Sequence, residues 1–171
     1  EDKIRSNLYK SETKRTKLKQ QKKSLSGWIK TLNLTIIIEK IKDENTPRAT
    51  QLLNKTNQMN LSTRRLNVQE FNNWIKVKSN NLWTVKATDK FGDYGIIGVL
   101  SISIKNNVAT LVDFILSCRV VGRYIEETMI EFLKEFCCKN GVDKIQGKYK
   151  KTEKNSLCYY FFNKLKLINS N

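Results

Sequence analysis

Apolar side chains recur at every second position near the start of the chain, and this spacing predicts a β-strand. Leu34, Ile36 and Ile38 fall on one side of that strand, while Thr35 and Glu39 fall on the other. Four later segments of strand length are also rich in apolar and β-branched residues. They are residues 82–88, 96–104, 108–116 and 144–149.

Apolar residues spaced three and four positions apart predict helices between these strands. Phe71, Trp74 and Ile75 follow that spacing. Thr46 followed by Pro47 is typical of a helix cap and a first helical position. The expected helices are residues 28–32, 46–55, 67–78, 155–165 and 123–139, the last of which buries Ile125, Met129, Leu133 and Phe136 and ends at Asn140-Gly141.

The body of the chain therefore follows the order β-α-α-β-β-β-α-β-α. Asn106-Asn107 separates the third and fourth strands, and this pair predicts a tight hairpin turn. Periodicity alone indicates an α/β or α+β domain.

The N-terminal segment differs from this body in composition. Residues 1–21 contain neither Pro nor Gly and are rich in helix formers, which predicts a helix. Its side chains are nearly all polar, so we expect a solvated helix whose removal changes stability little. We interpret residues 1–30 as a basic helical linker from a missing upstream domain and residues 31–171 as the folded domain. Glu1 in place of Met indicates a fragment of a longer protein.

The chain is strongly basic, with 32 basic and 16 acidic side chains and a formal net charge of +16. Such a charge attracts acidic partners, which include nucleic acid, phosphorylated cofactors and acidic carrier proteins. Charge alone does not choose among them. Zinc-finger spacing and an RNA-binding aromatic pattern are absent from the sequence, so a nucleic-acid partner is not favoured. The apolar runs are too short to span a membrane, and no membrane partner is expected.

Catalytic chemistry is limited by the residue types present. The chain has no histidine, and its four cysteines, at positions 118, 137, 138 and 158, form no C-x-x-C pair. This excludes zinc bound with the usual Cys/His spacing and Ser-His or Cys-His catalysis. The cysteines are expected to be small core residues in a reducing cytoplasm. Cys118, next to Arg119, is the candidate for an alternative role as an acyl-accepting thiol.

A loop after the strand at 108–116 is the main candidate for a ligand site. There an apolar strand leads through a short segment containing a glycine directly into a helix, which places free N–H groups beside a helix N-terminus. Such a site attracts a pyrophosphate. The residues expected to bind it are Arg119, Val120, Val121, Gly122, Arg123 and Tyr124. Their pattern resembles the R/Q-x-x-G-x-G/A loop that holds coenzyme A in the GNAT acyltransferase superfamily, except that Tyr124 replaces Gly or Ala.

Four segments extend this resemblance, and they occur here in the family's order. They are residues 54–65, 89–95, 116–123 and 147–155. Together they resemble the C-terminal GNAT-like domain of FkbH-like proteins, over about residues 35–167. The resemblance implies a mixed central sheet flanked by helices on both faces. It also implies a coenzyme A or phosphopantetheine thioester as a substrate-like cofactor, without a metal.

The resemblance implies partners as well. In FkbH-like proteins the domain follows a phosphatase-like domain of the haloacid dehalogenase superfamily, and the proteins are associated with loading three-carbon units onto acyl carrier proteins. The D-x-D-x-T motif of that upstream domain is absent from this chain. An acidic acyl carrier protein and the upstream domain are the expected partners.

A polar run between two predicted helices is the candidate for the acceptor side of the site. Its residues are Asn57, Gln58, Arg64 and Arg65. Amides orient an acceptor by paired hydrogen bonds, and an arginine holds a carboxylate or phosphate bidentately. The alternative is a network that caps helices and folds the loop.

Proton transfer would need a group other than histidine. Asp93, at a predicted turn, and Asp113, within the strand before the loop, are the candidate acids, although a buried structural carboxylate is the alternative for Asp113. GNAT enzymes often carry a tyrosine as general acid in the last helix, where this chain has Phe162. Tyr160 is the candidate substitute, with Tyr159 as the alternative. Asn155 aligns with an asparagine that contacts the pantetheine arm, or else caps the last helix.

These features predict a GNAT-like acyltransferase domain that binds acyl-CoA or an acyl-phosphopantetheine carrier in a polyketide-type or related pathway. A nucleophile would attack the thioester directly, and N–H groups beside the strand at 108–116 would stabilise the oxyanion. The alternative is a non-catalytic docking domain for the carrier protein. The missing histidine and the phenylalanine at position 162 favour that alternative.

Overall fold

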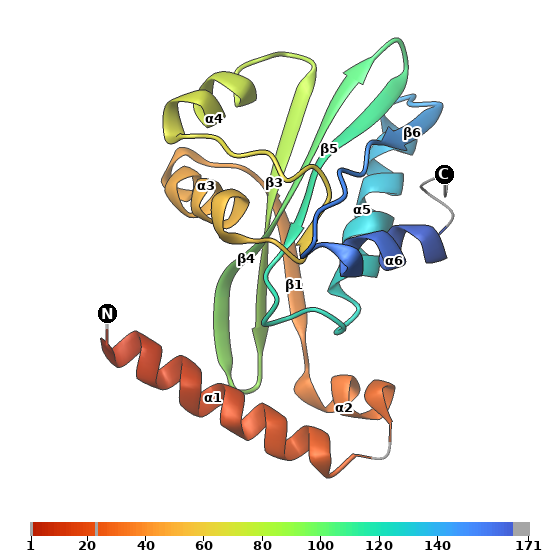
Figure 1. The fold of residues 1–171 in the computed structure, drawn as a ribbon. Helices are drawn as coiled ribbons and strands as arrows, with labels where there is room; N and C mark the ends of the chain where they lie inside the picture. Colours follow the sequence, from red (N-terminus) through yellow and green to blue (C-terminus); the bar gives the residue numbers. More distant parts are fainter. Residues whose placement is uncertain (1, 23, 166–171) are drawn as a thin grey trace. The chain divides into compact units, whose positions relative to one another are not determined.

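The computed structural model describes the backbone of residues 2–22 and 24–165, and the side chains from residue 9 onward within these ranges. Its helices and strands follow the predicted order, with one additional short strand (Figure 1). The elements are α1 (Asp2–Gln20), α2 (Leu25–Leu32), β1 (Thr35–Lys40), the 3-10 turn η1 (Asp43–Asn45), α3 (Thr46–Lys55), β2 (Met59–Asn60), α4 (Val68–Ile75), β3 (Asn80–Asp89), β4 (Gly92–Lys105), β5 (Val108–Leu116), α5 (Ile125–Lys139), β6 (Lys144–Gly147) and α6 (Ser156–Lys164).

The described residues form two compact units. The first unit comprises the chain up to Ile37 together with Lys86–Ile96. The second unit comprises Ile38–Val85 together with the chain from Ile97 onward. The second unit contains the predicted pyrophosphate loop.

The sheet is mixed, and its strands follow the order β1-β3-β4-β5-β2, with β6 also paired to β5. Strands β4 and β5 are antiparallel, whereas β5 and β6 are parallel. Asn106 and Asn107 join β4 to β5 with φ angles of 49° and 59°. Two successive positive φ angles are the requirement of a two-residue hairpin turn, so this prediction is confirmed.

Helices cover both faces of the sheet in the second unit. Neighbouring residues of a strand point to opposite faces, so the side chains of Asp113 and Phe114 in β5 lie on different faces of the sheet. The Phe114 ring meets Phe162 of α6, with 5.0 Å between ring centroids. Asp113 pairs with Arg64, whose guanidinium carbon lies 4.4 Å from the ring centroid of Trp74 on α4. The mixed sheet with helices on both faces is therefore confirmed.

The helix ends follow local chemistry, with one correction. The N-cap of α3 is Asn45 rather than Thr46, because Thr46 already has helical φ and ψ angles and is the first residue of the helix. Asn67 and Glu70 form a complete capping box at the start of α4. Gly141 has a φ of +64°, which suits the position after the end of α5 and agrees with the predicted stop.

In the first unit, most of the described side chains of α1 are exposed, as predicted, but the helix also makes specific contacts with the β3–β4 hairpin. The Arg15 side chain is buried, and its Nε and Nη2 atoms each donate to Asp89 at 2.7 Å. The guanidinium carbon also lies 4.0 Å from the centroid of the Tyr94 ring. The Ser11 hydroxyl donates to the Phe91 carbonyl at 2.9 Å. An apolar face was therefore the wrong criterion, because this helix packs on the β3–β4 hairpin through a charged pair.

Candidate functional site

The predicted pyrophosphate loop connects β5 to α5, and all six of its predicted residues lie between these elements. Gly122 and Tyr124 adopt left-handed backbone conformations, with φ angles of +77° and +62°. Gly122 and Arg119 are exposed, whereas Val120 and Arg123 are buried. The Arg119 Nε donates to the Ser117 hydroxyl at 3.3 Å. A glycine in this conformation lets the chain turn tightly into the N-terminus of α5.

A carboxylate of the chain itself occupies part of this loop. The Gly122 N–H donates to Oε1 of Glu126 at 2.7 Å. Glu126 is only 3% exposed, and its Oε2 has no hydrogen-bond partner within the described part of the chain. Burial raises the pKa of Glu126, although the N–H groups of Gly122, Glu126 and Ile125 oppose that rise. Sequence reasoning missed this residue, and its only signal was an acid in the first turn of a helix.

Asp113, a predicted catalytic acid, is fully buried and completely hydrogen-bonded. Its oxygens accept from Nε of Arg64 at 2.8 Å and from Nη2 of the same side chain. The hydroxyls of Ser62 and Ser101 donate to it as well. This geometry favours the structural alternative for Asp113, because its lone pairs are engaged inside the protein.

The predicted acceptor residues mainly hold their own loop together. Arg64 is engaged with Asp113, as described above. Arg65 donates from Nη2 to Asn57 at 2.7 Å and from Nη1 to the Leu53 carbonyl. Gln58 is exposed. Asn57 and Arg65 also line an open depression of about 410 Å³ together with residues 152–154.

Asn155 uses both ends of its buried amide within the protein. Its Nδ2 donates to the carbonyls of Asn60 at 3.1 Å and Lys150 at 2.8 Å. Its Oδ1 accepts from the Thr152 N–H at 2.8 Å and from the Tyr149 hydroxyl at 2.7 Å. Asn155 stands at the N-cap of α6 but forms no side-chain cap bond, so it ties segments together instead of capping.

The added strand β2 covers the second half of the outer edge of β5. Met59 and Asn60 pair with Leu116 and Ile115, and the Leu61 N–H donates to the Phe114 carbonyl at 3.3 Å. The first half of that edge pairs with β6. An oxyanion was expected to bind N–H groups along this edge, but the edge is already paired along most of its length. A two-residue strand gives no periodic signal, so the sequence could not reveal it.

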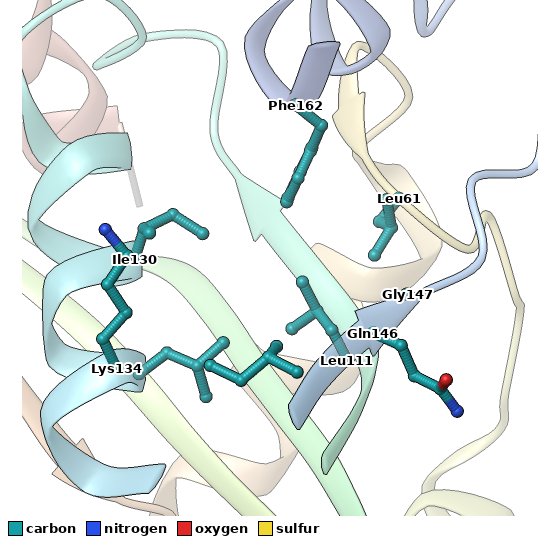
Figure 2. A pocket seen from close by; sticks show the side chains of 9 residues that line it. Leu61, Leu111, Ile130, Lys134, Gln146, Gly147 and Phe162 are labelled. Carbon is teal, nitrogen blue, oxygen red and sulfur yellow. The ribbon is translucent and has the colours of Figure 1, made fainter. Parts of the chain in front are cut away.

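An apolar pocket lies beside the last paired residues of β5 and β6 (Figure 2). Its walls come from α5, α6 and both strands, and they are lined by Leu61, Leu111, Ile130, Leu133, Lys134, Ile145, Gln146, Gly147 and Phe162. Phe162 is buried in this wall, whereas the predicted Tyr160 is 67% exposed. The Tyr160 ring contacts Tyr159, at 5.8 Å between centroids. No tyrosine hydroxyl is among the groups that line the pocket.

Asp93, the other predicted acid, belongs to the first unit. It was predicted in a turn but is the second residue of β4, where it is exposed and its Oδ1 accepts from the Gly95 N–H at 2.6 Å. An aspartate that accepts from the N–H two residues later closes a turn, which accounts for its position.

The cysteines divide into two classes. Cys137 and Cys158 are buried, as predicted, whereas Cys118 and Cys138 are exposed, so the expectation of four core cysteines is wrong for half of them. Burial raises the pKa of the Cys158 thiol to about 12, against the effect of the Asn60 backbone.

In the described ranges there is no group of three or more His, Cys, Asp or Glu side chains suited to a metal. None of the described helices is both long and apolar enough to cross a membrane.

Comparisons with solved structures identify the fold. The ribosomal-protein-S18-alanine N-acetyltransferase of Escherichia coli matches with a TM-score of 0.58 and 11% identity, over 77% of this chain and 76% of that protein. A GNAT-family acetyltransferase of Staphylococcus aureus matches with a TM-score of 0.57 and 12% identity, over 77% and 83%. AAC(6')-Iy, in complex with the bisubstrate analogue CoA-S-monomethyl-acetylneamine, matches with a TM-score of 0.59 and 10% identity, over 80% and 93%.

These likenesses show that the chain has the GNAT fold. No protein-family model matches the sequence. No curated protein sequence matches it either.

Proposed function

We propose that this domain binds the phosphopantetheine arm of an acyl thioester, carried either by coenzyme A or by an acyl carrier protein, and that it is an acyltransferase of the GNAT type. The observation that carries the proposal is the β5–α5 loop. Within a GNAT fold it presents an exposed glycine with φ +77° and an exposed Arg119 at the start of a 15-residue helix. Phosphate groups are bound by such N–H groups and by the positive end of the helix.

The chemistry proposed is direct attack of an amine, hydroxyl or thiol on the thioester carbonyl. The bond from the nucleophile to the acyl carbon forms, the C–S bond breaks, and the pantetheine thiolate leaves and takes up the nucleophile's proton. The loop would hold the phosphate end of the arm and thereby position the thioester. Asp113 and Asn155 are committed to internal hydrogen bonds, so they support the architecture of the site and do not carry the proton.

A second function is a non-catalytic docking domain that positions an acidic carrier protein for the upstream phosphatase-like domain of an FkbH-like protein. Three observations favour it. Phe162 occupies the position of the expected tyrosine, the outer edge of β5 is paired with β2 and β6, and Asp113 is engaged in an ion pair. The net charge of +16 suits an acidic carrier protein in either case.

A matched pair of variants at Gly122 tests the ligand site. Asparagine and aspartate both tolerate the left-handed conformation and have the same size, but only aspartate adds a negative charge. A Cβ at this position would meet no atom within 4 Å, so the first side-chain atom of either variant has room. We expect Gly122→Asp to abolish binding of coenzyme A and of a holo carrier protein in calorimetry at low salt. Gly122→Asn should retain most of the binding. Equal binding by both variants would contradict a phosphate site at this loop.

A further inference from the structure

Glu126 has the least satisfied buried carboxylate around the β5–α5 loop. Its side chain is 3% exposed, and one oxygen accepts from the Gly122 N–H while the other has no partner among the described residues. A buried charged oxygen without donors is costly, because it has lost its water and gained nothing in return. A position that serves only to stabilise the fold would be better filled by an apolar side chain or a fully bonded amide.

The position of this carboxylate is one that favours an anion. Glu126 lies in the first turn of α5, where the helix N-terminus favours negative charge. The left-handed conformation of Gly122 accompanies an N–H directed at the carboxylate, at 2.7 Å. That N–H is one of the groups with which the loop would bind a phosphate. The chain's own carboxylate therefore competes for the anion site.

We propose that Glu126 determines the ligand specificity of this loop by holding a negative charge in the anion site. The inference rests on the proposed function, and it concerns which phosphate-bearing ligand the site accepts. A diphosphate, as in free coenzyme A, brings two charges close to the carboxylate and must displace it from Gly122. The single phosphodiester of a carrier-bound phosphopantetheine brings one charge and meets less repulsion. The loop thus selects against free coenzyme A and in favour of the carrier-bound arm.

The test compares two substitutions in the same helical turn. Glu126→Gln keeps the size of the side chain and an oxygen acceptor for Gly122 but removes the charge. Glu127→Gln removes the same charge one residue later, from a half-buried side chain that forms no bond to Gly122 among those described. Dissociation constants are measured by calorimetry for coenzyme A and for a holo acyl carrier protein with the wild-type protein and both variants.

We expect Glu126→Gln to bind coenzyme A about tenfold more tightly than the wild type, and the holo carrier only about two- to threefold more tightly. Glu127→Gln should change either constant less than about twofold, because screened, solvent-accessible charges interact weakly. If the ligands bind but Glu126→Gln leaves the preference between them unchanged, or if Glu127→Gln has the same effect, the role of Glu126 is refuted while the proposed function stands. If no variant binds either ligand, both are refuted.

A second measurement covers the case in which Glu126→Gln folds poorly. In the wild-type protein, the Gly122 amide resonance reports on the bond to Glu126 by ¹⁵N–¹H NMR. Saturating coenzyme A should move this resonance strongly, since a diphosphate replaces the carboxylate as acceptor. A Gly122 resonance that stays in place while coenzyme A binds would show that the carboxylate and the ligand do not compete, and this would overturn the inference.

Discussion

Asp113 and Glu126 are two buried carboxylates in the same unit of the protein, and their surroundings differ in one decisive respect. Asp113 accepts four hydrogen bonds, two from Arg64 and one each from Ser62 and Ser101. Glu126 accepts from the Gly122 N–H, and its second oxygen has no partner among the described residues. Asp113 is paired with a positive charge, and both of its oxygens accept hydrogen bonds. The hydrogen bonds described for Glu126 include no positively charged donor.

The difference indicates a structural role for Asp113 and supports the role in binding that we propose for Glu126. A fully bonded buried ion pair fixes the geometry around it, and breaking it leaves a stranded charge. An incompletely bonded carboxylate at an anion-binding loop can exchange its partner for another. Asp113 would therefore matter mainly for stability, and Glu126 mainly for binding.

Removing Arg64 should cause the largest loss of stability. Arg64→Ala leaves Asp113 buried without its counter-charge, and we expect the free energy of unfolding to fall by about 3–5 kcal/mol. Urea denaturation with a linear extrapolation measures this. Arg65→Ala serves as the control, since Arg65 bonds only carbonyl and amide oxygens and should cost about 1 kcal/mol. Equal losses for the two variants would show that the Asp113 pair has no special role.

The Arg15–Asp89 pair extends the comparison to the first unit. Arg15→Ala should lower the free energy of unfolding by about 2–3 kcal/mol, because Asp89 then stays buried with bonds from Tyr94 and the Phe91 N–H but without its counter-charge. A change in the free energy of unfolding of less than about 0.5 kcal/mol would contradict a stabilising role for this pair and support a fully solvated helix.

The pH dependence of this pair follows from Asp89. Burial alone would raise the pKa of Asp89, but hydrogen bonds from Arg15, Tyr94 and the Phe91 N–H lower it overall. A lowered folded pKa stabilises the protein above the unfolded value of about 3.9, and that stability is lost as the pH falls through the folded value. The difference between the wild type and Arg15→Ala should therefore shrink below about pH 4, and a constant difference would contradict this origin.

Neutralising Glu126 should have the smallest effect on stability, and of the opposite sign. Because the folded pKa of Glu126 is raised, its charged form is disfavoured in the folded state at every pH above its unfolded value of about 4.3. Glu126→Gln should therefore be more stable than the wild type at pH 7, and the gain should vanish near pH 4. Thermal unfolding at the two pH values measures this. A loss of stability at pH 7 would place Glu126 with Asp113 as a structural acid.

Sequence patterns anticipated the elements of the body and their order, because alternation and helical spacing each extend over many residues. Asn106-Asn107 and Gly141 were predictable because few residue types adopt positive φ angles. The positions of Arg15, Glu126 and β2 were not predictable. An arginine in a polar helix has the same local pattern whether it is solvated or buried against Asp89. Arg64, which pairs with Asp113, and Asn60, whose carbonyl accepts from Asn155, lie 49 and 95 residues away in the chain, and only the fold brings them together.

Recognition of a phosphopantetheine arm is tested by comparing one acidic acyl carrier protein in its holo and apo forms. The two forms present the same protein surface and differ only in the arm. We expect the holo form to bind at least about tenfold more tightly in calorimetry at low salt, with both affinities falling as salt increases. Equal dissociation constants for the holo and apo forms would contradict recognition of the arm and leave only attraction between a basic and an acidic surface.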